Sequence, residues 1–142
     1  MCAGAISTCF KMEKFEQLQK LIQTIEYANK NQGWKIAIEL RNPSWYNEEV
    51  YDLVRQYNIC MVIHDLPASA TPHEVPTAGF PYLRFHGAGG KDRGSYTDDF
   101  LCQYAQHIRQ WANEGKAVYF YFNNTMGDAV KNLQTLNGFV LA

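Results

Sequence analysis

The chain has 142 residues, the length of one domain, and 46% of them are hydrophobic, which supports a buried core and argues against disorder. Its formal net charge is -1 and no cluster of Lys and Arg stands out, so composition gives no support for a nucleic-acid partner or an anionic membrane surface. The four cysteines are widely spaced, which favours reduced, buried thiols over a disulfide frame or a zinc knuckle. Neither a signal-peptide pattern nor a membrane-length apolar run is found, so we expect a cytoplasmic protein.

Helices and strands are predicted to alternate along the chain. Four apolar runs are predicted strands: residues 34–41 (WKIAIELR), 58–65 (NICMVIHD), 81–86 (PYLRFH) and 116–122 (KAVYFYF). Four segments have apolar residues at helical spacing: 15–25, which Gly33 closes, 47–57, 97–111 and 128–136. Asn47 and Thr97 are the expected N-caps of the second and third helices. Apolar strands between amphipathic helices are typical of a parallel sheet covered by helices.

Polar residues gather at the carboxyl end of every predicted strand. The four pairs are Glu39 and Arg41, His64 and Asp65, Arg84 and His86, and Asn123 and Asn124. In a parallel α/β sheet or barrel these ends lie on one face, where such folds build their sites. Period-two alternation places Glu39 with Arg41, and Arg84 with His86, on one side of their strands, so Ile38, Leu40, Leu83 and Phe85 are expected to face the helices. The inward member of each of the other two pairs stays open, because both alternating sets there are mostly apolar.

The third strand runs into a glycine-rich stretch, GAGGKDRG, at residues 87–94. A Walker loop and a dinucleotide-binding loop both fail at Asp92, which stands where Ser or Thr, or the last glycine, belongs. We therefore expect glycines that let the chain turn sharply over the rim. Such a turn would leave backbone N–H groups free for an anion near Arg84 and Lys91.

Together, four segments resemble the domain-of-unknown-function 72 family, also called YecE-like: IELRNPSWYNEEVYDLV, VIHDLP, PYLRFHGAGGKDRGSYTDD and VYFYFNNTMGDAVKNLQTL. They follow the family's order and spacing over roughly residues 10 to 142. The resemblance implies a TIM-type barrel and a site at its rim, but no established reaction. A complete (β/α)8 barrel has eight strands in about 250 residues. The predicted fold is therefore α/β: the C-terminal half of such a barrel, with about four parallel strands and covering helices.

The resemblance defines one partial domain over residues 1–142, in which residues 1–9 are atypical for the family. An isolated half barrel exposes two sheet edges and the inner faces of its strands. Three explanations stay open: a fragment of a longer barrel, which we favour, a homodimer that covers the open edges, or an open, rearranged α/β sandwich.

The strand ends supply the candidate site residues. The candidate catalytic residues are Glu39, Asp65 and His86, and the candidate substrate-binding residues are Arg41, Trp45, Arg84, Asn123 and Asn124. Each has a structural alternative. Glu39 and Arg84 can form an ion pair that fills the centre, His86 can bind a loop carbonyl, the asparagines can cap the last helix, and Trp45 can pack against the next helix, which we favour for this residue.

The predicted function is that of a small-molecule enzyme of hydrolase or isomerase type, acting on a small anionic or hydroxylated substrate. The alternatives are a non-catalytic protein that binds an anionic ligand, or an inactive fragment; whether the chain is an enzyme stays open. No cofactor is indicated. A divalent metal held by Glu39, His64, Asp65 and His86 has weak support, because their spacing matches no metal motif.

Overall fold

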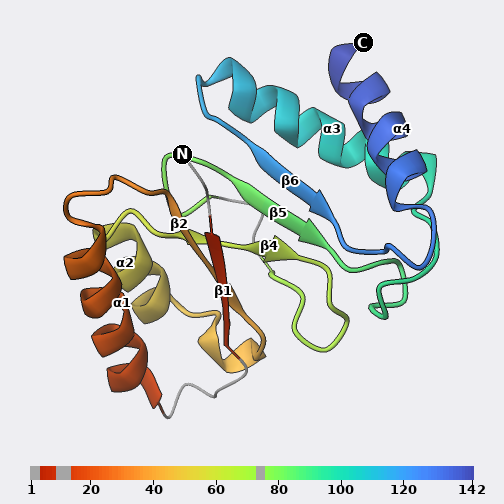
Figure 1. Ribbon diagram of the computed structural model, residues 1–142. Coiled ribbons are helices and arrows are strands. Elements are labelled where there is room, and N and C mark those ends of the chain that lie inside the picture. Colours follow the sequence, from red (N-terminus) through yellow and green to blue (C-terminus); the bar gives the residue numbers. More distant parts are fainter. Residues whose placement is uncertain (1–3, 9–13, 73–75) are drawn as a thin grey trace.

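The strands of the chain are all parallel and lie side by side in the order in which they occur (Figure 1). The computed structural model describes residues 4–8, 14–72 and 76–142. Its strands are β1 (Gly4–Thr8), β2 (Ile36–Leu40), β3 (Cys60–Met61), β4 (Ile63–His64), β5 (Tyr82–Phe85) and β6 (Tyr119–Phe122). Only Val62 separates β3 from β4, and its N–H donates to the Ile38 carbonyl at 2.9 Å, so Cys60–His64 acts as one strand that joins the two halves of the sheet.

Helices follow the strands as the sequence predicts. They are α1 (Phe15–Asn29), the 3-10 turn η2 (Pro43–Trp45), α2 (Glu48–Gln56), α3 (Asp98–Asn113) and α4 (Ala129–Leu141). The predicted N-caps are confirmed, because Asn47 accepts from the Val50 N–H and Thr97 from the Phe100 N–H. The fold is thus an α/β arrangement of parallel strands and helices. None of the helices in the described residues is long and apolar enough to cross a membrane.

Strand β1 was not among the predicted strands. Residues Gly4–Thr8 pair with Ile36–Leu40 of β2 over five consecutive rungs. Their sequence, GAIST, consists of small or β-branched residues with no clear alternation of polar and apolar positions, so periodicity gave no signal. The pairing partner, which lies about thirty residues away along the chain, defines this strand.

The apolar core lies between the sheet and its helices. Ile38 and Leu40 of β2 pack with residues of α1 and α2, and Leu83 and Phe85 of β5 pack with residues of α3. This confirms the predicted phase of both strands. We call the opposite side of the sheet its inner face; it carries Glu39, His64 and Arg84 at its carboxyl end.

The glycine-rich loop after β5 is held by hydrogen bonds. Its turns need glycine, because φ is +96° at Gly87, +67° at Gly90 and +80° at Gly94. The N–H of Gly90 donates to the Gly87 carbonyl, that of Asp92 to the His86 carbonyl, and that of Gly87 to the Tyr96 hydroxyl. The predicted sharp turn is present. The three N–H groups, however, donate to acceptors within the protein, so they are not available to an anion.

Candidate functional site

Glu39 is the centre of a charged cluster at the carboxyl end of the strands. Its carboxylate is fully buried, and Arg41 Nε donates to Oε1 at 2.5 Å, whereas Arg84 Nη1 donates to Oε2 at 3.0 Å. Burial by itself would raise the Glu39 pKa, but contacts with His86 and the two arginines outweigh it and lower the pKa to about 2. The carboxylate is therefore ionised at neutral pH.

Arg84 is fixed at both ends of its guanidinium. Its Nη1 donates to Glu39 Oε2. The hydrogen-bond network orients the Asn123 amide so that the amide oxygen accepts from Arg84 Nε and Nη2 at 2.7 Å each. Asn123 is therefore the inward residue of its pair. The Arg84 side chain keeps 28% exposure and that of Arg41 keeps 36%, so both cations reach solvent while their shared anion does not.

His86 lies beneath this cluster between two carboxylates. Its Nδ1 is 3.2 Å from Asp92 Oδ1, and its Nε2 is 3.8 Å from Glu39 Oε2, too far for a hydrogen bond. Among the described residues, buried Nε2 has no hydrogen-bond partner. The structural alternative expected a hydrogen bond from His86 to a loop carbonyl. The structure instead places the side-chain carboxylate of Asp92 next to the ring.

His64 is the inward residue of its pair. The Leu66 N–H donates to Nδ1, which leaves the proton on Nε2, 3.2 Å from the Leu40 carbonyl and 3.0 Å from the Tyr46 hydroxyl. Burial lowers the pKa of His64, so the ring is neutral at neutral pH. Burial also raises the pKa of Tyr46 to about 12. His64 and Tyr46 thus form a neutral hydrogen-bonded wall beside Glu39.

Asp65 points away from the cluster, to the helix side of the sheet. One carboxylate oxygen accepts from the His86 N–H at 2.7 Å, and the other accepts from the Tyr96 hydroxyl, whose pKa is raised by burial and by this carboxylate. That hydroxyl in turn accepts from the Gly87 N–H. Asp65 therefore fixes the backbone at His86, and it does not join Glu39 and His86 at the inner face.

Two other candidate site residues, Trp45 and Asn124, have buried side chains outside the charged cluster. Trp45 is 1% exposed and packs in the core between β2, α1 and α2, the placement that the packing alternative expects. Asn124 is fully buried, and its amide nitrogen donates to the Gly94 carbonyl and to Asn132 of α4. It ties the loop before α3 to α4 rather than facing the cluster.

The structure also places the four residues considered as metal ligands, which are Glu39, His64, Asp65 and His86. Within the described residues, no group of three or more His, Cys, Asp and Glu side chains is placed to hold a metal ion. Asp65 is turned away, and His64 Nε2 lies against the Leu40 carbonyl and the Tyr46 hydroxyl.

Sequence reasoning missed several residues that shape this site. Asp92 and Tyr96, which hold His86 and Asp65, lie in the loop and could be recognised only from contacts in space. Tyr121 could have been predicted to lie on the same face of its strand as Asn123, because the two residues are two positions apart.

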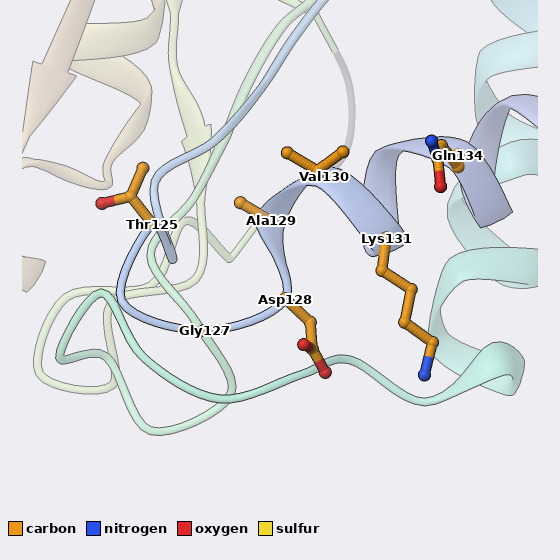
Figure 2. A pocket seen from close by; sticks show the side chains of 7 residues that line it. All are labelled: Thr125, Gly127, Asp128, Ala129, Val130, Lys131 and Gln134. Atoms are coloured by element: carbon orange, nitrogen blue, oxygen red, sulfur yellow. The ribbon is translucent and has the colours of Figure 1, made fainter.

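A separate cavity of about 500 Å³ opens at the start of α4 (Figure 2). Its lining includes Asp128 and Lys131, whose side chains extend on the same side of the helix, so the lining carries one carboxylate and one ammonium group. None of the candidate site residues lines it. The cavity is distinct from the charged cluster.

Parallel strands covered by helices, with charged side chains gathered at the strand ends, define an α/β protein of the class that builds its sites at that end of the sheet. A family profile described as "Protein of unknown function DUF72" matches residues 6–140, so the chain belongs to the DUF72 family, as its motifs predict. No curated protein matches the chain.

Solved structures of the same family share the fold. The chain is similar to a DUF72 family protein from Thermotoga maritima MSB8, with a TM-score of 0.81, 23% identity and coverage of 99% of this chain and 58% of that one. It is also similar to a DUF72 family protein from Enterococcus faecalis V583, with a TM-score of 0.77, 24% identity and coverage of 99% and 61%. The chain thus spans about three fifths of the length of these structures.

Proposed function

We propose that the chain binds a small anionic ligand, such as a carboxylate or phosphate, through Arg41 and Arg84. One observation carries this proposal: two partly exposed guanidinium groups share one buried carboxylate, Glu39. Two cations on one anion leave one positive charge in excess. The shared carboxylate holds both guanidinium groups in place, so little conformational entropy remains to be lost when an anion binds.

The proposed fold context is the C-terminal half of a TIM-type barrel. Parallel strands in sequential order, a helix layer on one face and the match to part of longer DUF72 structures support it. In such barrels sites lie at the carboxyl ends of the strands, where Arg41, Arg84 and Asn123 gather. The other face of this sheet would then be the barrel interior.

Binding of inorganic phosphate and of acetate, measured by calorimetric or NMR titration, tests the anion site. We expect Arg84→Gln and Arg41→Gln each to weaken binding about tenfold or more, because each removes a charge-assisted hydrogen bond. Arg55→Gln is the matched control, since Arg55 pairs with Glu48 and Asp52 on the surface of α2. Arg41→Gln is the safer variant, because the Arg41 side chain is the more exposed of the two. Equal binding by wild type and both variants would overturn the proposal.

A second candidate is an acid–base enzyme of hydrolase or isomerase type, favoured by the buried, unpartnered Nε2 of His86 among the described residues. Asp92 at the other ring nitrogen orients the imidazole, and Glu39 lies near the nitrogen that would carry the proton. Asp65 then acts as a positioning residue through the His86 backbone. Release of p-nitrophenol from its phosphate and acetate esters tests the hydrolase form. Activity that His86→Asn leaves unchanged would remove His86 from this role.

A further inference from the structure

Three tyrosines form a stack on the inner face of β5 and β6, next to Arg84. The ring centroids of Tyr82 and Tyr121 are 5.0 Å apart with their planes at 24°, and those of Tyr82 and Tyr119 are 6.2 Å apart at 21°. Near-parallel rings at these separations are typical of offset stacking. The stack continues the row of inner-face side chains that ends in the charged cluster.

The stack is closed at one side and open at the other. Tyr82 is the middle ring and is only 6% exposed, and at one end Tyr119 packs against Phe80 and lies under Lys35 Nζ. Tyr121 at the other end is 43% exposed, the highest exposure of any inner-face aromatic residue that the structure describes. Tyr82 lies against one face of the Tyr121 ring, and among the described residues no other aromatic ring contacts Tyr121. A second planar ring can therefore extend the stack on Tyr121.

The exposed ring of Tyr121 and the partly exposed guanidinium of Arg84 belong to neighbouring residues on adjacent strands. Arg84 of β5 and Tyr121 of β6 are partners in the parallel register, and both project from the inner face. Asn123, two residues along β6, holds the Arg84 guanidinium in place. Arg84 and Tyr121 thus project side by side from adjacent strands, which lie about 4.8 Å apart in a sheet.

We propose that the ligand of this site is an aromatic anion: its carboxylate or phosphate binds Arg84 and Arg41, and its planar ring stacks on Tyr121. This inference rests on the proposed anion site and adds the chemical class of the rest of the ligand. Burial and the neighbouring Tyr121 raise the pKa of Tyr82 to about 12, so the phenol beside the site is neutral and does not repel an anion. A small anion without a ring would leave the exposed face of Tyr121 uncovered.

Two pairs of probes that differ only by a ring test this inference: phenyl phosphate against methyl phosphate, and benzoate against acetate. Titration of the 142-residue chain should give a dissociation constant about 3- to 10-fold lower for the aromatic member of a pair, the range of a favourable aromatic contact. Tyr121→Ala should reduce this ratio to about one. Tyr121→Phe keeps the ring and should retain the ratio.

Tyr27→Ala is the matched control, because Tyr27 on α1 is 83% exposed and belongs to no stack on the inner face. If all four probes bind and ring and ringless members bind equally, the aromatic preference is wrong and the anion site stands. A ratio that survives in Tyr121→Ala would likewise remove Tyr121 from the site. If no probe binds, the anion site itself is wrong, and the aromatic ligand falls with it.

Discussion

Glu39 is the single side chain whose charge holds the strand-end cluster together. Its carboxylate is fully buried and accepts from Arg41 and Arg84. Replacing it by glutamine keeps the shape but leaves two cations facing a neutral amide. Removing one partner of a buried ion pair commonly costs about 3–5 kcal/mol. We therefore expect Glu39→Gln to lower the free energy of unfolding by about that amount at neutral pH, measured by urea denaturation.

The same carboxylate predicts how this difference depends on pH. The folded-state pKa is about 2 against 4.5 for the unfolded chain, so the unfolded state takes up the proton first as the pH falls. The stabilisation by ionised Glu39 is complete above about pH 5 and is lost on acidification toward pH 2. A shift of this size corresponds to about 3 kcal/mol. The gap between wild type and Glu39→Gln should shrink by roughly that amount between pH 5 and pH 2.

Glu114→Gln is the control for the Glu39 experiment. Glu114 pairs with Lys116 at the surface, where ion pairs contribute little, so this variant should follow the wild type at every pH. If the difference in unfolding free energy between wild type and Glu39→Gln stays constant from pH 5 to pH 2, the lowered pKa of Glu39 is wrong.

The sequence predicted the facing direction of the side chains in some strands and not in others. Alternation in β2 and β5 correctly placed Glu39 and Arg84 on one face, because only one of the two alternating sets there is apolar. In the other two strands both sets are apolar, so packing in space decides that His64 and Asn123 turn inward. The actual partner of Asp65, the Tyr96 hydroxyl, is 31 residues away along the chain.

The glycine-rich loop between β5 and α3 is tightly packed at Gly87 and Gly90 but open at Gly89. A Cβ added to Gly87 would lie 2.2 Å from the Arg93 carbonyl oxygen, and φ there is +96°. A Cβ added to Gly89 would meet nothing within 4 Å, and the φ of Gly89 is not positive. The two glycines differ in their surroundings although they lie two residues apart.

We expect Gly87→Ala to destabilise the protein by about 1–3 kcal/mol, because it combines a strained φ with a backbone clash. Gly89→Ala should change the free energy of unfolding by less than about 1 kcal/mol and serves as the matched control. Urea denaturation of both variants provides the measurement. Equal stability of the two variants would show that the loop rearranges around Gly87 without cost.

Most elements were predictable because local signals agreed with the fold. Asn47 and Thr97 cap the helices that they were expected to cap, and amphipathic spacing located the helices. Strand β1 was not predictable in this way, since small residues give no periodic signal and its pairing with β2 spans a helix. The break between β3 and β4 at Val62 was not predictable either. It arises because β3 pairs with β2 whereas β4 pairs with β5.

The sheet has two open edges within the described residues. Strand β1 pairs only with β2, and β6 pairs only with β5. Next to β6, helix α4 exposes Val130 at 70% and Leu133 at 41%, three residues apart and hence on one side of the helix. Exposed sheet edges and apolar helix surface favour association with another chain.

We propose that a second copy covers the edge formed by β6 and α4. Counting Cys60–His64 as one strand, each copy brings five parallel strands, so two copies exceed the eight of a regular TIM-type barrel and would meet at this edge without closing one. Light scattering during size exclusion at micromolar concentration should then give about twice the 16.3 kDa of one chain. The double variant Val130→Lys and Leu133→Lys should return the mass to that of a single chain, because paired copies would bring these lysines together. Tyr27→Lys, on the exposed side of α1, should leave the dimer intact. A wild-type chain that elutes at the single-chain mass across the accessible concentration range would exclude this dimer.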